Sequence, residues 1–241
     1  MQFDWINFYS ELATKLLSFK NDRKTLIEKI KSVYTSIDMK IPKLDSGEEI
    51  IDIDPFTVFG LFNKGITNSN RLSIITGIAN EFGIEVKIPD NFDGIPVLNN
   101  LKATFYGFDK RKENDIEHLW KLFSSALKLS DADTEENRAA FSKWYDIVHE
   151  QLCIRWNLTM ALYWIRPYYF INLDSRNRWY ITNIENMPSE FVESVKPKLN
   201  KLPNAADYLF IRDACRSAME NGDYEYKNFP ELSYYAWKIS E

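Results

Sequence analysis

Apolar residues spaced three and four positions apart recur along most of this 241-residue chain, and this spacing constrains its fold more than any other feature. Within residues 4–19, for example, Trp5, Phe8, Leu12 and Leu16 would share one face of a helix. The chain is therefore predicted to be mainly α. The same spacing predicts further helices over residues 23–37, 56–62, 70–82, 115–129, 135–152, 158–165, 189–199 and 206–222.

Residues that cap helices stand at several of the predicted starts. Asp22 precedes the second helix, the Asp54-Pro55 pair opens the third, and Thr67 or Asn68 precedes the fourth. Helical spacing stops between residues 84 and 112, where proline and glycine recur.

Strand candidates are few: residues 84–88, 102–106 and, later in the chain, 179–183. We expect one module over residues 1–241, in which a helical hairpin (1–40) packs on a helical core (54–222) with a minor β element.

Composition and charge narrow the class of protein. No apolar run approaches the roughly 18 residues of a membrane helix, and the start lacks the features of a signal peptide, so a cytoplasmic protein without membrane contact is expected. A pI of about 5.3 and a net charge of −5 argue against coating nucleic acid by bulk charge. Cys153 and Cys215 fit no metal or disulfide pattern and are expected to be reduced thiols.

Sequence patterns for cofactor chemistry are incomplete. Residues 60–67 (GLFNKGIT) have glycines at the interval of a phosphate-binding loop, but Ile66 occupies the position of its lysine and no strand is predicted before it. His118 and His149 have no metal-ligand partner at helical spacing and no catalytic triad around them. No cofactor is therefore expected.

Residues 155–180 (RWNLTMALYWIRPYYFINLDSRNRWY) combine aromatic and arginine side chains more densely than the rest of the chain. Eight of these residues are aromatic and four are arginines, against a single acid, Asp174. Aromatic rings stack on nucleobases and guanidinium groups pair with phosphates, so the stretch predicts a local nucleic-acid surface. A buried aromatic helix followed by ion-paired arginines is the alternative interpretation.

Several consecutive patches resemble the N-terminal regions of McrB-like AAA-type proteins, the GTP-dependent subunits of modified-cytosine restriction systems. The patches are FDWINFYSELATKLL, DIDPFTVFGLFNKGITNSNR, IPVLNNLKATFYGF and WNLTMALYWIRPYYFINLDSRNRWYI. The resemblance implies a DNA-recognition module whose partners are DNA, a motor domain and a nuclease subunit. This chain contains no valid P-loop, so GTP hydrolysis is not carried over.

A weaker similarity concerns helix-hairpin-helix DNA glycosylases, in which a turn containing an aspartate and a small hydroxyl residue follows a helix. LTMALYWIRPYYFINLDSRNR is similar to that order, with Asp174 and Ser175 in the equivalent places. The glycine-rich hairpin is missing, because residues 153–156 read CIRW, and no catalytic lysine is evident. The similarity implies either a glycosylase-like fold that reads DNA or, as an alternative, an enzyme centred on Asp174.

The sequence therefore predicts a helical DNA-binding module of a McrB-like system that reads a modified base. Two alternatives stay open: a domain that docks the motor on its nuclease partner, and a glycosylase-like enzyme with Asp174 as catalytic candidate. The predicted roles are stacking for Trp164, Tyr168, Tyr169 and Trp179, phosphate or base-edge contacts for Arg166, Arg176 and Arg178, a phosphate contact for Lys64, and reading of a base edge by Asp174 or Asn177.

Overall fold

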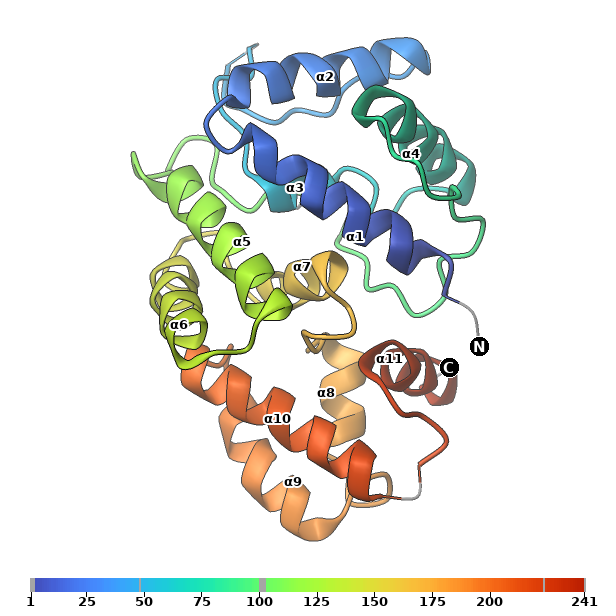
Figure 1. The fold of residues 1–241 in the computed structure, drawn as a ribbon, viewed down its shortest axis with the longest axis vertical. Coiled ribbons are helices and arrows are strands. Elements are labelled where there is room, and N and C mark those ends of the chain that lie inside the picture. Colours follow the sequence, from blue (N-terminus) through green and yellow to red (C-terminus); the bar gives the residue numbers. More distant parts are fainter. Residues whose placement is uncertain (1–2, 48, 100–102, 223, 241) are drawn as a thin grey trace.

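The computed structural model describes residues 3–47, 49–99, 103–222 and 224–240 and confirms a mainly α fold (Figure 1). Within these residues the elements are α1 (Trp5–Leu16), the 3₁₀ turn η1 (Leu17–Phe19), α2 (Arg23–Ser36), α3 (Pro55–Gly60), α4 (Asn68–Phe82), α5 (Asp115–Asp131), α6 (Glu135–His149), α7 (Asn157–Ile165), α8 (Ser175–Ile181), α9 (Ser189–Val195), η2 (Lys196–Leu199), α10 (Ala205–Asn221) and α11 (Phe229–Ile239).

Helices α2 and α4 pack together at one end of the elongated molecule, and α9 and α10 lie at the other (Figure 1). Gly77 of α4 permits the close approach of α2, because a Cβ at this position would lie 2.9 Å from a methyl carbon of Val33. Helix α1 packs against α7, while α5 and α6 form the most extensive helix pair of the fold.

Helix α7 lies at the centre of the molecule and is apolar on every side (Figure 1). All of its residues from Leu158 to Ile165 are buried. A helix that is hydrophobic all round belongs in the interior of a protein. The first part of the aromatic stretch is therefore scaffold, and any exposed chemistry in this region must come from the segments on either side of α7.

Two predictions about the C-terminal half were wrong. Residues 179–183 do not form a strand, because Tyr180 and Ile181 belong to α8, whose first turn is capped by the Asp174 carboxylate. Residues 206–222 are not the last helix, because α11 follows, with Asn228 as its cap and Pro230 in its first turn. Helix α11 packs on α8, so these two short elements form one unit.

The predicted minor β element is also missing from the described residues. Residues 84–88 are irregular, as is the described part of the second candidate, 103–106; Lys102 lies outside the described residues. A single bridge, between Lys64 and Leu98, joins two extended segments. None of the described helices is long and apolar enough to cross a membrane.

Candidate functional site

Three pockets that share lining residues adjoin one another on the face formed by α7, α8 and α11. The first pocket, of about 380 Å³, lies between the outer ends of α8 and α11 and is lined by Ser175, Arg176, Trp179, Ile239 and Ser240. The second, of about 460 Å³, shares Ser175 and Arg176 with it. The third, of about 530 Å³, shares Val97 and Met160 with the second. We call this set of pockets the α8 groove.

The wall of the groove opposite α8 is an irregular segment, residues 92–97, whose carbonyl groups are held by side chains from three helices. Trp5 of α1 donates its indole N–H to the carbonyl oxygen of Asp93 at 3.3 Å. Ser233 of α11 donates to Gly94 at 3.2 Å, and Trp164 of α7 donates to Pro96 at 3.0 Å. Buried donors therefore fix the backbone of a loop that has no regular secondary structure.

Asp174 caps α8 and lines the second pocket. One carboxylate oxygen accepts the backbone N–H of Asn177 at 2.9 Å, and the other accepts the side-chain amide of Asn172 at 2.9 Å. A carboxylate that caps a helix and orients a neighbouring amide has a structural role without any substrate. The two bonds occupy two of the roughly four lone-pair sites of the carboxylate.

A layer of buried polar groups lies directly under the second pocket. Asn177 donates its side-chain amide to the hydroxyl of Ser233 at 3.1 Å, and Ser233 lines the pocket. The side-chain oxygen of Asn177 is buried without a hydrogen-bond partner among the described residues, and the hydroxyl of Tyr163 is buried beside that of Ser233. Burial also raises the pKa of Tyr163 well above its ordinary value, so the phenol stays protonated. Unpartnered buried polar atoms are uncommon in folded proteins, and the Asn177 oxygen belongs to a side chain that contacts Ser233 of the pocket.

Arg178 and Trp156 stack on each other at the inner side of the third pocket. The guanidinium carbon of Arg178 lies 3.6 Å from the centre of the Trp156 ring, and Trp156 lines the pocket. Burial lowers the pKa of Arg178, an effect that Asp174 opposes. One nitrogen of this guanidinium is buried and has no hydrogen-bond partner among the described residues. Arg178 is therefore a support for an aromatic ring and does not point freely into solvent.

The chain matches a protein family over residues 5–239, nearly its entire length. It belongs to the family described as a domain of unknown function (DUF8425). Comparisons with curated proteins and with solved structures find no match to this chain. The family match covers all of the groove residues except Ser240 and assigns no activity. The function of this DUF8425 chain has to be argued from its side chains.

The groove brings together some of the residues that the sequence predicted. Arg176 is exposed and lines two of the three pockets, Trp179 is 45% exposed at the open end, and Asp174 borders the centre. Asn177 and Arg178 lie one layer deeper, the first under Ser233 and the second behind Trp156. Both arginines, Arg176 and Arg178, are on α8 itself.

Other predicted contact residues lie away from the groove surface, and burial is the reason in two cases. Trp164 is fully buried and has no free ring face, so the prediction that it stacks on a base was wrong. Lys64 is buried behind Leu98, and burial lowers its pKa, so it is not a free phosphate contact. Tyr168 is exposed but does not line any of the three pockets.

Arg166 is occupied by α1. Its guanidinium donates to the carbonyl oxygen of Ser10 and to the hydroxyl of Thr14, both at 3.2 Å. The closest carboxylate oxygen, on Asp131, lies 4.0 Å away. Arg166 therefore links the end of α7 to α1. These contacts account for its position without a phosphate ligand.

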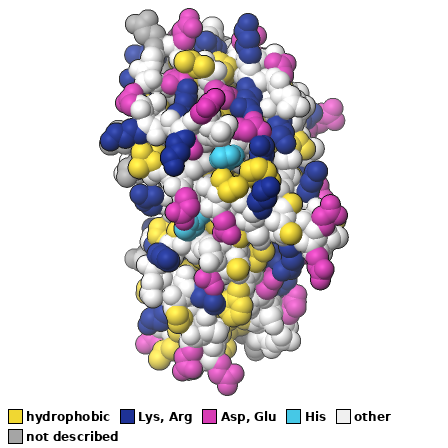
Figure 2. Space-filling model, turned by 90° about the vertical axis from the view of Figure 1, so that its left-hand side faces the viewer, with side chains coloured by type: hydrophobic (Ala, Val, Ile, Leu, Met, Phe, Trp, Pro, Cys, Tyr) yellow, Lys and Arg dark blue, Asp and Glu magenta, His cyan; other side chains and the backbone are white. Residues whose placement is uncertain are grey.

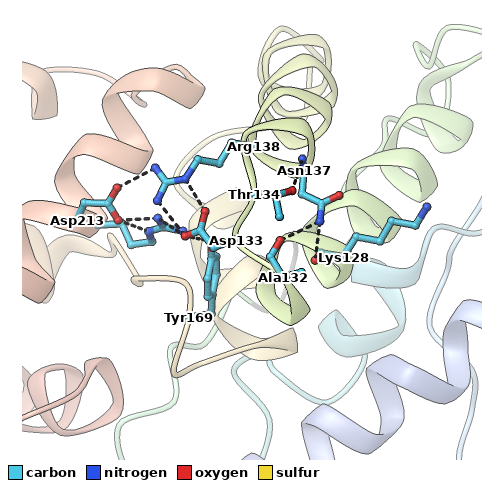
Figure 3. Close-up of polar contacts among 9 residues, drawn as sticks. Lys128, Ala132, Asp133, Thr134, Asn137, Arg138, Tyr169 and Asp213 are labelled. Atoms are coloured by element: carbon cyan, nitrogen blue, oxygen red, sulfur yellow. Dashed lines mark hydrogen bonds and ion pairs between the residues drawn. The ribbon is translucent and has the colours of Figure 1, made fainter.

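Tyr169 takes part in an ionic network outside the groove (Figure 3). Its hydroxyl donates to Asp133 at 2.7 Å, and the guanidinium of Arg212 lies 4.4 Å from the centre of its ring. Asp133 also accepts from Arg138, whose second branch reaches Asp213 at 3.0 Å. Hydrogen bonds from Arg138, with the charge of Arg212, hold the pKa of Asp133 at about 2. This network ties α6 to α10, so Tyr169 is a structural residue.

The face formed by α5 and α6 carries no stripe of one charge. Figure 2 shows basic and acidic side chains interspersed on this side of the molecule, with the two histidines among them. His118 lies beside the ring of Trp144, and His149 contacts Glu150 and the carbonyl oxygen of Leu202. Within the described residues no group of three or more histidine, cysteine or acidic side chains could hold a metal ion.

Sequence reasoning missed part of the groove because its walls come from segments far apart in the chain. Val97 and Leu152 are exposed apolar residues in the third pocket, and Trp237 of α11 lines the second. Trp156 and Arg155 were inside the aromatic and arginine stretch but outside the predicted contact set. Their position directly before the predominantly apolar helix α7 was the signal that could have identified them.

Proposed function

We propose that this chain is the DNA-recognition module of a McrB-like modification-dependent restriction system, and that the α8 groove receives DNA. The supporting observation is that the adjoining pockets of the groove are lined by two exposed arginines, the exposed Trp179 and the half-buried Trp156. Arg176 and Trp179 stand at one end, and Arg155 and Trp156 stand at the other.

The chemistry of these groups suits a nucleic acid better than a small polar ligand. Arginine pairs with phosphate through two parallel hydrogen bonds, and indole rings stack on any base. Each stacked base contributes about 1 to 3 kcal/mol, which is comparable to the few kcal/mol needed to unstack a base from a duplex. The groove could therefore test a base for modification, with the buried polar layer under Ser233 within reach of its edge.

The net charge of −5 limits how strongly such a surface can bind. Asp93 and Asp174 line the same groove as Arg155 and Arg176, so the charges of its lining side chains sum to zero. Modest affinity on its own fits a module that acts together with a motor domain and a nuclease subunit in the cytoplasm.

A protein-docking role is the second candidate, and one observation favours it. Val97, Leu152 and Ile239 are large apolar residues, each about half exposed, along the groove. Exposed apolar side chains gathered on one face are typical of protein interfaces. In this alternative the groove binds a segment of the nuclease partner or of the motor.

Binding of duplexes with and without 5-methylcytosine, measured by fluorescence anisotropy at low salt, tests the proposal. Arg176→Ala should weaken binding about 5- to 30-fold, as expected for a lost charge-assisted contact of about 1 to 2 kcal/mol. Lys24→Ala is the matched control, because Lys24 is an exposed cation on α2, at the other side of the molecule from α8 (Figure 1). Equal affinities of the wild-type protein and both variants would reject the groove as the DNA site.

A further inference from the structure

Trp156 has two unlike faces. Arg178 covers one of them, at 3.6 Å from the ring centre. The residue itself is only half-buried and lines the third pocket of the groove, whereas Arg178 is not among the residues that line that pocket. The ring thus separates a fixed cation on the inside from an open pocket on the outside.

The pocket on the outer face has the size and lining of a site for a flat ring. It measures about 530 Å³, and apolar side chains, among them Val97, Phe108, Leu152 and Met160, form most of its wall. Arg155, which is exposed, stands at its edge and donates to the carbonyl oxygen of Ile154. A flat ring with a phosphate attached would place the ring on Trp156 and the phosphate near Arg155.

The guanidinium of Arg178, on the inner face of Trp156, determines whether the outer face binds an uncharged ring or a cation. A tryptophan face attracts cations because its π electrons are negative, and this attraction is the basis of aromatic sites for ammonium groups. Arg178 already uses that attraction from inside, and its positive charge would repel a second cation across the ring. An uncharged aromatic ring is not repelled and can stack.

We infer that the outer face of the Trp156 ring binds an uncharged heteroaromatic ring of the nucleobase type. This site excludes organic cations, and Arg178 is the positioning residue on the other face of the ring. This inference rests on the proposed function and adds the place and the chemical selectivity of the base contact. It also reassigns Arg178, which the sequence predicted to touch phosphates or base edges.

Indole N–H signals of the full chain, followed by nuclear magnetic resonance, test the site directly. The probes are 5-methyl-2′-deoxycytidine 5′-monophosphate, thymidine 5′-monophosphate and tetramethylammonium. The Trp156 signal, identified by its loss in Trp156→Phe, should shift saturably with both nucleotides and should not respond to tetramethylammonium. Trp144 is the matched control, because Lys121 and Lys143 lie within 5 Å of its ring centre outside the groove.

Variants separate positioning from direct contact. Trp156→Leu should weaken nucleotide binding about 5- to 150-fold, the equivalent of one lost stack of about 1 to 3 kcal/mol. Arg178→Leu should cause a smaller loss and should allow tetramethylammonium to shift the Trp156 signal, whereas Arg178→Lys should keep the cation excluded. In the double variant, Arg178→Leu should add almost nothing to the loss from Trp156→Leu, because it acts through that ring.

The outcomes of these experiments distinguish the inference from the proposed function. Absence of a nucleotide-induced shift at Trp156, or an equal shift with tetramethylammonium, overturns the inference whether or not the chain binds DNA. The positioning role of Arg178 is overturned if the losses of nucleotide affinity caused by Trp156→Leu and by Arg178→Leu multiply in the double variant. Nucleotide binding at Trp156 in a chain that fails to bind any duplex supports the inference and rejects the proposed function.

Discussion

Replacing Trp164 with alanine is expected to destabilise the fold strongly. The side chain is fully buried, packs edge-on against Phe105 at 6.3 Å, and donates its indole N–H to the carbonyl oxygen of Pro96. Removing a buried tryptophan costs about 3 to 5 kcal/mol. The unpartnered Pro96 carbonyl adds about 1 kcal/mol.

The sum, about 4 to 6 kcal/mol, is a large part of the roughly 5 to 15 kcal/mol that stabilises a typical domain. For a chain of this length it corresponds to a fall in melting temperature of roughly 8 to 24 °C. Thermal denaturation followed by circular dichroism measures it. Because the alanine variant could unfold, Trp164→Phe serves as a milder change that mainly removes the hydrogen bond to Pro96, with an expected cost of about 1 to 2 kcal/mol.

Trp179→Ala is the matched control, since Trp179 is a tryptophan of the same stretch that is 45% exposed. It should lower the melting temperature by no more than roughly 4 °C but weaken DNA binding by about 1 to 3 kcal/mol. A melting temperature of Trp164→Ala within roughly 4 °C of the wild type would refute the assignment of α7 to the scaffold.

Three further predictions follow from the same contacts. Asp174→Asn should lower stability by about 1 kcal/mol, because asparagine keeps the α8 cap but loses the oxygen that accepts from Asn172. The wild type should release no base, and abasic sites formed in modified DNA by the wild-type chain would contradict this. A plot of the logarithm of DNA affinity against the logarithm of salt concentration should have a slope of roughly −2 to −3, because Arg155, Arg176 and at most one more cation contact phosphates. An affinity independent of salt would exclude phosphate contacts. Asp133 has its pKa lowered from 3.8 to about 2, so its stabilising effect is fully present above about pH 4 and is lost as pH falls towards 2. The side chain is 28% exposed, so we expect about 1 to 2 kcal/mol, measured as a stability gap between wild type and Asp133→Asn that closes in this window.

The helical part of the fold could be predicted because its signals are local. Asp22 accepts the backbone N–H of Thr25, and Asp54 accepts those of Phe56 and Thr57, as expected for residues that cap helices. Thr67, one of the two residues predicted to cap the fourth helix, does the same for Asn70. At these positions the spacing of apolar residues and the capping residue predict the same helix start. The helix can therefore be predicted without information from distant residues.

Short elements were predicted less well because their stability comes from packing. Helix α8 has seven residues, and its adjacent aromatic residues Trp179 and Tyr180 suggested a strand. Tyr180 instead packs against Tyr226 and Tyr235, which lie more than 40 residues later. Asp174 and Asn228 are residue types that cap helices, and they precede α8 and α11 in the sequence. Both helices could have been predicted if these capping residues had been given more weight than the adjacent aromatic residues.

The aromatic and arginine stretch was predicted as one surface, but its side chains divide between the core and the groove. Whether a side chain of this stretch faces the core depends on the residues that pack beside it. Trp164 donates to the carbonyl oxygen of Pro96, Arg166 donates to that of Ser10, and Arg178 stacks on Trp156. None of these contacts can be inferred from spacing within the stretch. The groove itself combines α7, α8 and α11 with the loop at 92–97, which only the folded chain brings together.

Hydrogen exchange of the backbone amides, measured by mass spectrometry with and without a 5-methylcytosine duplex, tests the central claim most directly. DNA bound in the α8 groove should slow exchange in residues 92–97, 152–157 and 174–179 and leave α2 and α4 unchanged. Slower exchange confined to α2 and α4 or to the α5–α6 face, or no change at saturating DNA, would contradict the proposal that this groove reads DNA.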